Sequence, residues 1–317
     1  MASEKNLNAV FSDIANSIRS KKGTTGTIQP INMASEIDSI ETGGGDIDAL
    51  IDGSITEITS NVASIRPYSF YQCKNLTTVN LPNISTIPDY AFYQCENLAI
   101  ANFSPTNITT IGNWAFSGCY KLTSYNFPEV TTIESYAFNG YRGSEAIFPK
   151  ATKVGYYAFN GGQMTIIDFP LLTSTSNSEF RYCRHLVTIN LPQLKNIGNN
   201  TFDGDEQLTT VVFPEVTEIS GWAFNKCLNL ETVDLPKAKR VGGSEVFYYC
   251  PKLTTLILRA NEVATLGSSN VFNYTPIKTS TTEGFIYVPD DLVESYKSAT
   301  NWSTYASKIK GLSELGE

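Results

Sequence analysis

A phenylalanine recurs at nearly constant spacing along most of this 317-residue chain, and that period limits the folds open to it. The nine positions, separated by 21 to 24 residues, are Phe70, Phe92, Phe116, Phe138, Phe159, Phe180, Phe202, Phe224 and Phe247. A proline keeps the same period at Pro82, Pro105, Pro128, Pro149, Pro170, Pro192, Pro214 and Pro236. A unit of about 22 residues cannot bury its own apolar side, so stacked neighbours have to cover it. The period therefore predicts a repeat solenoid.

One copy of the repeat, IPDYAFYQCENLAIANFSPTNITT at residues 87–110, shows what each part is suited to form. The run LTTVNLP at 76–82 alternates apolar and polar residues, which is typical of a short half-buried strand. Its proline ends the strand because it has no N–H to donate to a ladder. The Ala-Phe pair predicts a tight or helical turn that packs the Phe inward. Nine or so strands stacked about 4.8 Å apart predict a curved slab roughly 45 Å long.

All six cysteines occupy one position of the repeat, three residues after a Phe and three before a Leu. They are Cys73, Cys95, Cys119, Cys183, Cys227 and Cys250. Other units carry Tyr141, Gly162 or Asp205 there, so we interpret the cysteines as reduced, buried fillers. A disulfide such as Cys227–Cys250 is the alternative, although equivalent side chains in a stack point the same way. Spacings of 22 to 64 residues and the lack of C-x-x-C argue against a zinc site.

Composition excludes two classes of partner. The formal net charge is −8, the isoelectric point is about 4.9, and only 17% of residues are charged. Nucleic-acid binding requires clustered Lys and Arg, and the sequence has no such cluster. No apolar run approaches the ~20 residues of a membrane span. The N-terminus does not resemble a signal peptide, so we expect release by lysis or assembly, or a leader removed from this chain.

The N-terminal flank predicts a small helical module over residues 1–42. Apolar residues follow helical spacing over 5–20, and a second short helix is expected over 31–40. This module either folds onto itself and the first repeat, or mediates homo-oligomerisation or attachment to a virion. ETGGGD at 41–46 is a flexible joint and marks a boundary.

The C-terminal flank predicts a capping helix. Pro289, followed by two aspartates, signals a helix start, and Leu292, Tyr296 and Trp302 give an apolar side. A solenoid has to shield its terminal edge, which a cap does. The expected domains are a helical module (1–42), a Gly-rich linker and entry to the first repeat (43–60), the solenoid (61–280) and the cap (281–317).

The repeat pattern I-x-x-x-A-F-x-x-C-x-x-L-x-x-V-x-L-P, from about Ile65 to Leu266, resembles the BspA-like leucine-rich repeat family. The resemblance implies a right-handed coil with one parallel β-sheet face and short helical turns opposite. Known members include bacterial surface adhesins. The units at 133–154 and 154–175 depart from the pattern because they lack both the Cys and the Leu, which puts regular curvature there in question.

Both flanks also resemble parts of known proteins. Residues 6–40 are similar to a short N-terminal module of prophage tail and baseplate proteins from gut bacteria. Residues 286–314 are similar to the C-terminal cap that often closes such arrays in the same proteins. The resemblance implies a tail or baseplate component whose partners include virion proteins, bound through residues 1–42.

The sequence offers little for catalysis, metal binding or cofactors. His185 is the only histidine, and Cys183 two residues before it already belongs to the repeat. The loop FDGDEQL at 202–208 could hold calcium through Asp203, Asp205 and Glu206, but it also has the length of an ordinary turn. We favour the structural interpretation. No phosphate-binding Gly loop or acid pair is evident, so we expect no enzyme activity and no cofactor.

Two columns of surface residues are candidates for ligand binding. The first lies near the end of each strand and faces outward; it contains Asn80, Asn102, Asn126, Asp168, Asn190 and Asp234, with Ile147, Val212 and Ile257 in other units. Such groups can bind a sugar or a protein by hydrogen bonds, or they simply keep the sheet hydrated. The second lies two residues before each repeated Phe and contains Tyr68, Tyr90, Trp114, Tyr136, Tyr157 and Trp222. Tyr and Trp suit both ligand contact and packing between repeats.

The sequence thus predicts a non-enzymatic binding or structural protein. The leading hypothesis is a phage-derived tail or baseplate component that recognises a bacterial cell-surface protein or glycan through its repeats. The alternative is a secreted or surface-anchored bacterial adhesin that binds host protein or glycan. We expect the protein in the virion in the first case, and outside the cell or on its surface in the second.

Overall fold

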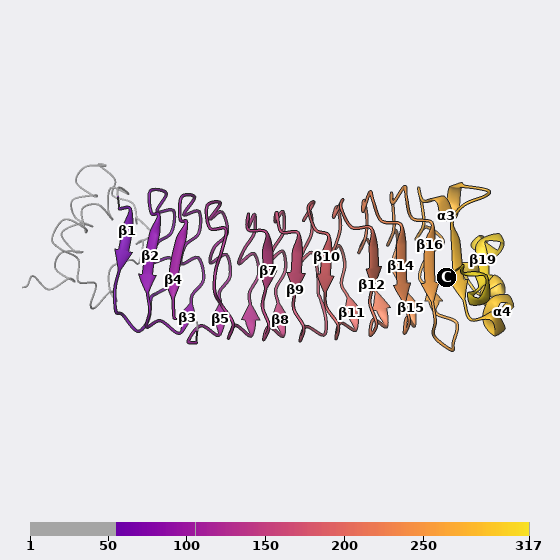
Figure 1. Ribbon diagram of the computed structural model, residues 1–317, viewed down its shortest axis with the longest axis horizontal. Helices are drawn as coiled ribbons and strands as arrows, with labels where there is room; N and C mark the ends of the chain where they lie inside the picture. The colour runs from indigo at the N-terminus through magenta and orange to yellow at the C-terminus, as the bar shows by residue number, and fades with distance from the viewer. Residues whose placement is uncertain (1–54, 105, 317) are drawn as a thin grey trace, which may run out of the picture.

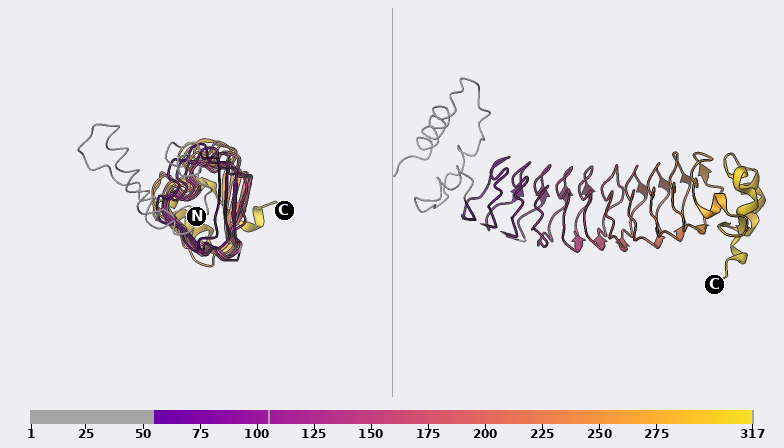
Figure 2. Two further views of the ribbon diagram at one scale, coloured as in Figure 1. Left: turned by 90° about the vertical axis from the view of Figure 1, so that its left-hand side faces the viewer. Right: turned by 90° about the horizontal axis from the view of Figure 1, so that it is seen from above.

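The computed structural model of the protein describes residues 55–104 and 106–316. They form one elongated solenoid whose turns stack along a single axis (Figure 1). Seen along that axis, the turns lie almost one behind another (Figure 2). The predicted repeat solenoid is confirmed. The helical module expected over 1–42 lies outside the described residues.

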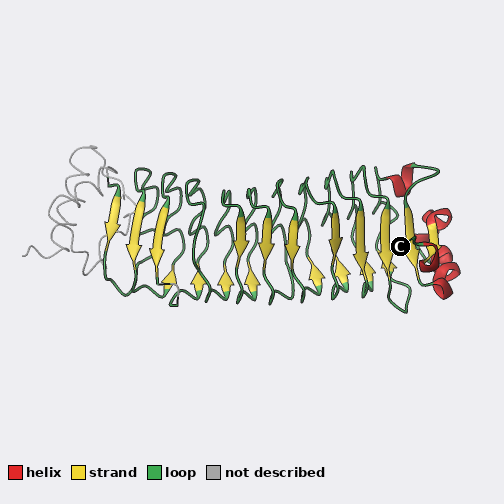
Figure 3. Ribbon diagram, viewed as in Figure 1, coloured by secondary structure: helices red, strands yellow, loops and turns green. Residues whose placement is uncertain are grey.

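One face of the solenoid is a parallel sheet to which each turn, except that of residues 123–127, adds one short strand (Figure 3). The strands pair in three groups: β1 (Glu57–Thr59), β2 (Thr78–Leu81) and β4 (Ile100–Phe103); β7 (Glu145–Ile147), β9 (Ile166–Asp168) and β10 (Thr188–Asn190); and β12 (Thr210–Val212), β14 (Thr232–Leu235), β16 (Thr255–Leu258), β18 (Phe285–Val288) and β19 (Ile309–Gly311). We call this the main sheet. Its strands alternate as predicted, because Val79 is buried while Thr78 and Asn80 are partly exposed.

A second, narrower sheet follows each main strand and was not predicted. Its two-residue strands are β3 (Thr86–Ile87), β5 (Thr110–Ile111), β6 (Thr132–Ile133) and β8 (Lys153–Val154), and then β11 (Asn196–Ile197), β13 (Glu218–Ile219), β15 (Arg240–Val241) and β17 (Thr265–Leu266). Each strand buries its second residue. Two residues are too few for a periodic pattern, so periodicity in the sequence cannot reveal this sheet.

The edge around each repeated Phe consists of hydrogen-bonded turns and not of the short helices that the family resemblance implied. Two residues per turn have left-handed backbone, two before and two after the Phe, as at Tyr68 (φ 64°) and Gln72 (φ 59°). That conformation cannot continue a helix. The Phe N–H instead donates to the next turn, as from Phe70 to Ala91 O (2.8 Å). Backbone bonds therefore tie the turns together on this edge as well.

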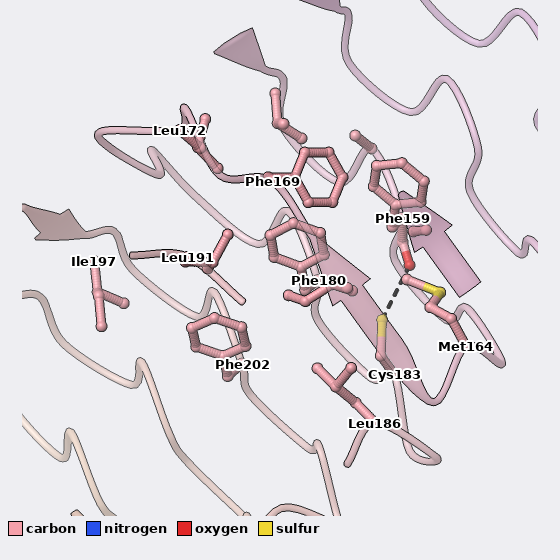
Figure 4. Close-up of a cluster of buried hydrophobic side chains, with 14 of the residues drawn as sticks. Phe159, Met164, Phe169, Leu172, Phe180, Cys183, Leu186, Leu191, Ile197 and Phe202 are labelled. Carbon is pink, nitrogen blue, oxygen red and sulfur yellow. Dashed lines mark hydrogen bonds between the residues drawn. The ribbon is translucent and has the colours of Figure 1, made fainter. Parts of the chain in front are cut away.

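The core is a set of columns that run along the axis. The repeated Phe rings stack from turn to turn, and Phe272 extends the column beyond the nine predicted positions. Figure 4 shows Phe159, Phe180 and Phe202 in this column beside Cys183. All three rings are fully buried. The stacked columns provide the burial that a single turn lacks.

The two units that lack Cys and Leu keep the stack by other means. The ring of Tyr141 occupies the cysteine position of its turn and is buried. At Gly162 the buried side chain of Met164 fills the space, since a Cβ on Gly162 would collide with its sulfur. The buried Phe column therefore continues through both units, whereas the second sheet ends at β8 and resumes at β11.

The main sheet is interrupted in two places. Residues 123–127 form no strand and pair with neither β4 nor β7. A second break separates β10 from β12, each of which pairs on its other side. In an unbroken part, the carbonyl before each strand accepts bonds from the next turn, as Thr77 O does from Ala99 and Ile100 N–H. Across the described residues, the carbonyls of Ala99, Thr123 and Val187 receive no such backbone bond.

The C-terminal end is closed as predicted. After α3 (Pro276–Thr279), the chain adds β18 to the sheet, then forms η1 (Asp290–Leu292), α4 (Val293–Ser298), η2 (Trp302–Lys308), β19 and η3 (Leu312–Glu314). The indole Nε1–H of Trp302 donates to Ala264 O (2.6 Å), and Ala264 N–H donates to the Tyr296 hydroxyl (3.0 Å). The cap thus satisfies backbone groups at the last turn that would otherwise lack a partner.

Candidate functional site

The most continuous surface feature is a ladder of five aromatic side chains, one in each of five successive turns. Its members are Tyr68, Tyr90, Trp114, Tyr136 and Tyr157, and we call it the aromatic ladder. Consecutive ring centroids are 4.7, 6.0, 4.0 and 5.0 Å apart, and the planes are within 13° of parallel. The structure therefore brings five of the six predicted aromatic residues together.

Stacking decides which part of each ring a ligand can reach. The planes of Tyr90, Trp114 and Tyr136 are covered on both sides by neighbouring rings. A sugar cannot lie flat on them, and what these rings present is edges and polar tips. Tyr tips and Trp edges of this kind are frequent in protein interfaces. Partial burial, and next the neighbouring Tyr157, raise the pKa of Tyr136, so its hydroxyl stays a hydrogen-bond donor at neutral pH.

The backbone does not explain why this position is aromatic. The nine turns from Phe70 to Phe247 all have left-handed backbone there, whether the residue is Trp114 (φ 58°), Ser178 (φ 62°), Asn200 (φ 55°) or Glu245 (φ 59°). Gly and Asn adopt this conformation at the lowest cost, and a bulky ring does so rarely. The five aromatics must therefore be retained for their contacts with one another or with a ligand.

Sequence reasoning missed a second aromatic row beside the ladder. Tyr71 and Tyr93 directly follow the repeated Phe and stack at 5.1 Å. Tyr93 also packs edge-on against Trp114 (5.8 Å) and Tyr90 (5.7 Å). The signal was present, since both residues occupy one position of the repeat. Together the two rows form a broad aromatic surface over the first turns.

Trp222, the sixth predicted aromatic, lies apart from the ladder. Ser178 and Asn200 separate it from Tyr157. Its indole is 38% exposed and its ring is tilted by 38° against Tyr248. Tyr248 in turn meets Tyr274 edge-on at 5.1 Å. A second aromatic group therefore lies toward the C-terminal end.

The outward column on the main sheet follows the sheet's interruptions. Asn102 Nδ2 donates to Asn80 Oδ1 (2.6 Å), and Asn80 Nδ2 donates to Thr59 Oγ1 (3.0 Å). Asn190 Nδ2 likewise donates to Asp168 Oδ1 (2.8 Å), whereas Arg259 pairs with Asp234. Asn126 lies in the interruption and has no pairing partner in the sheet. The expected continuous field is thus three shorter groups.

The cysteines are free and buried, as predicted. Five of them also hold neighbouring turns together. Each of these thiols donates to the Phe carbonyl of the preceding turn, as from Cys95 Sγ to Phe70 O (2.9 Å) and from Cys183 Sγ to Phe159 O (3.2 Å; Figure 4). Burial raises the pKa of Cys73 to about 11 and raises that of Cys95 well above its ordinary value, so these thiols stay protonated and unreactive.

His185 and Cys183 do not form a catalytic pair. His185 is exposed, whereas the thiol of Cys183 is in the core and bound to a carbonyl. Nucleophilic catalysis needs an accessible thiolate within reach of its base. The arrangement lacks both features.

The acidic turn at 202–208 is occupied by protein groups. The Asp203 carboxylate accepts Arg181 Nε–H (2.7 Å) and Asn225 Nδ2–H (2.7 Å). Asp205 fills the cysteine position; its Oδ1 accepts Cys183 N–H (2.8 Å), while Oδ2 is buried without a partner. Burial raises the pKa of Asp205 well above its ordinary value, and Asp203 adds to the effect. These contacts agree with a structural role for the turn.

Nowhere within 55–104 and 106–316 do three His, Cys, Asp or Glu side chains gather where they could hold a metal ion. In the same part of the chain, every helix is too short or too polar to cross a membrane.

Parallel strands, one repeated turn and a capped end define this chain as a leucine-rich-repeat solenoid. The profile of the BspA type leucine rich repeat region (six copies) matches residues 53–167 and 173–293. The chain belongs to this family. A comparison with curated proteins finds no match.

Several solved structures are similar to this chain. A leucine-rich repeat protein from Bacteroides ovatus is 20% identical, with 79% of this chain and 88% of that chain covered and a TM-score of 0.40. One from Eubacterium ventriosum is 16% identical, with coverage of 74% and 73% and a TM-score of 0.47. A leucine rich cell surface protein from Faecalibacterium prausnitzii is 19% identical, with coverage of 66% and 80% and a TM-score of 0.32.

Proposed function

We propose that this protein is a non-enzymatic binding protein that recognises a cell-surface ligand through its repeats, as a phage-derived tail or baseplate component. The observation that carries the proposal is the aromatic ladder. Its five rings occupy a position where other turns carry Ser, Asn or Glu, so the fold does not require them. Aromatic side chains clustered on a rigid scaffold supply large contact area at low entropic cost.

The geometry favours a protein ligand at the ladder. Ring planes inside the stack are covered, so contact would be made by ring edges, by tyrosine hydroxyls and by the adjacent row of Tyr71 and Tyr93. The long axis of the solenoid offers the same contact several times in succession. Attachment of several copies to one particle would then convert a weak single contact into firm adhesion.

The tail or baseplate assignment is supported by the similarity of residues 6–40 to the N-terminal module of such proteins. Mass spectrometry of particles purified from an induced lysogen tests it, and we expect the protein among their components. Its absence from the particles, together with its presence on the producing cell, would contradict this assignment and favour a bacterial adhesin.

Binding through the ladder is tested with fluorescently labelled protein and intact bacterial cells. We expect Trp114→Ala with Tyr136→Ala to reduce cell binding by about tenfold or more, the effect of losing interface anchors. Trp222→Ala is the matched control, because it removes an exposed aromatic outside the ladder and should leave binding nearly unchanged. Equal loss in both variants would show that the ladder has no special role.

A further inference from the structure

The interruption of the main sheet at residues 123–127 exposes backbone groups that the other turns use for pairing. No backbone hydrogen bond joins this segment to 99–103 on one side or to 144–147 on the other. The carbonyl of Thr123 instead accepts the Tyr141 hydroxyl of the next turn (3.1 Å). That carbonyl corresponds to Thr77 O, which accepts two backbone N–H groups.

Two tyrosines account for the interruption. The inward position of the main strand is Val79, Ala101, Tyr125, Ala146 and Ile167 in successive turns, so one large ring lies between two alanines. The ring of Tyr125 packs against Phe148 (4.9 Å), Phe138 (5.3 Å) and Tyr141 (5.4 Å). A ring of this size holds the backbone away from its neighbours. The Tyr141 hydroxyl also occupies Thr123 O, the carbonyl that would otherwise accept the backbone hydrogen bonds of the main sheet.

The separation leaves a groove on each side of the segment. The groove toward β4 measures about 320 Å³ and includes Ile100, Asn102, Ser124 and Asn126 in its lining. The groove toward β7 measures about 340 Å³, and Ser144, Glu145 and Ile147 contribute to its wall. Both volumes are at the lower end of the range for small-molecule sites. Tyr125 lines both grooves.

The lining mixes donors, acceptors and apolar surface. Main-chain N–H groups of 123–127 have no partner in the described part of the chain, and neither do the side chains of Ser124 and Asn126. Glu145 is exposed and forms no ion pair with the residues that the structure describes. The exposed side chains of Ile147 and Ile100 supply the apolar part. Unpaired backbone groups that are partly shielded from water favour a ligand able both to donate and to accept.

We propose that these paired grooves bind saccharide residues of a cell-surface glycan. Each sugar hydroxyl both donates and accepts, which matches a wall of N–H, C=O, amide and carboxylate groups. The apolar faces of the sugar ring would lie against Ile147 and Ile100. A peptide strand is the competing occupant, but the volume of each groove falls at the small end of ligand sites. The site is separate from the aromatic ladder and does not depend on the ladder's function.

The test compares a closed and an open form of the site in the full-length protein. Tyr125→Val with Tyr141→Cys restores the residue types that regular turns carry, as at Val79 and Cys95. It should let residues 123–127 pair with the neighbouring strands of the main sheet. Tyr125→Phe keeps the ring and so keeps the grooves open. Amide hydrogen exchange at 123–127 should be fast in the wild type and in Tyr125→Phe and markedly slower in the closed variant. Unchanged exchange in a folded closed variant would refute the explanation of the grooves.

The binding arm uses an array of bacterial and host glycans, followed by titration of the strongest saccharide. Wild type and Tyr125→Phe should bind equally, and the closed variant should lose about tenfold or more in affinity. Asn126→Ala should weaken binding in the open protein. An array with no signal, or full affinity in a variant shown to be closed, would overturn the proposal. If an extended peptide were selected from a random library, and if its binding were lost in the closed variant, the ligand of the grooves would be a peptide strand and not a saccharide.

The outcome can be separated from that of the proposed function. Ladder variants such as Trp114→Ala leave the grooves intact, and closure of the grooves leaves the ladder intact. Loss of cell binding in the ladder variants with an empty glycan array would refute only the saccharide site. A positive array with unaffected ladder variants would refute only the ladder.

Discussion

Two aromatic columns run along this solenoid with the same period, one inside and one outside. The inner column is continuous from Phe70 to Phe272, with centroids 5.2 to 5.9 Å apart. The outer column, the aromatic ladder, stacks equally well but ends at Tyr157. The fold therefore requires a ring at every turn in the core and at none on the edge. This difference makes the ladder available for function.

The largest effect is expected in the inner column. Phe116→Ala should lower the free energy of unfolding by about 3–5 kcal/mol, because it removes a buried ring that contacts both neighbours in the stack. Urea denaturation measures the change, and Phe116→Leu, which keeps most of the volume, serves as the milder control. A loss near zero would show that the core column is dispensable.

Trp114→Ala should have a smaller effect on stability, about 2 kcal/mol, because two stacking contacts are lost at a half-buried position. Its effect on cell binding should be the larger one. Urea denaturation and the cell-binding assay on the same preparations check both parts. If Trp114→Ala destabilised the protein as much as Phe116→Ala, the ladder would be packing and the contrast between the columns would vanish.

Asp205 gives a pH-dependent test of the core. Its pKa is raised by burial, so the folded state binds this proton more tightly than the unfolded state does. Stability from this group is greatest below the unfolded-state pKa of about 4 and falls as the pH rises above it. Asp205→Cys should therefore add about 1–2 kcal/mol at pH 7.5, by removing a buried oxygen that lacks a partner.

The gain in Asp205→Cys should shrink as the pH is lowered toward 4.5. Urea denaturation at both pH values measures it, and Asp168→Asn on the sheet surface controls for a general loss of charge. A gain that is the same at both pH values would contradict the assignment of a raised pKa to Asp205.

The smallest effect is expected at the cysteines. Cys95→Ala should cost about 1 kcal/mol, since it removes one thiol and its bond to Phe70 O. Cys95→Ser keeps a donor and separates this bond from loss of volume. Chemical denaturation of the three proteins gives the comparison. A loss of unfolding free energy near that of Phe116→Ala would mean that the thiol does more than fill core volume and donate one hydrogen bond.

The repeat allowed most of the fold to be predicted. Phe, Cys, Leu and Pro recur together, and each has one physical reason for its place, so strand, turn and stacking direction followed from them. The second sheet was not predicted because each of its strands, such as Thr86 and Ile87, has only two residues and therefore shows no periodic pattern. The left-handed turns were missed because Tyr68 and Gln72 are residue types that rarely adopt that conformation.

The candidate sites could be predicted only in part from the sequence. The ladder residues could be found because they share one repeat position, and Tyr71 and Tyr93 could have been found in the same way. The grooves beside Tyr125 depend on a departure from the repeat. Their sequence signal is one Tyr between Ala101 and Ala146 in a column that is otherwise aliphatic, and its meaning emerges only when turns are aligned in space.

The interrupted main sheet also has a mechanical consequence. Along most of the solenoid, neighbouring turns are joined by bonds of the main sheet, of the second sheet and of the turn edge. Beside residues 123–127 the first of these is missing, although β5, β6 and β8 continue the second. A pulling force between a bound surface and the other end of the rod would be shared by fewer bonds here. The rod should stretch or give way first at an interruption of the main sheet, either beside residues 123–127 or between β10 and β12.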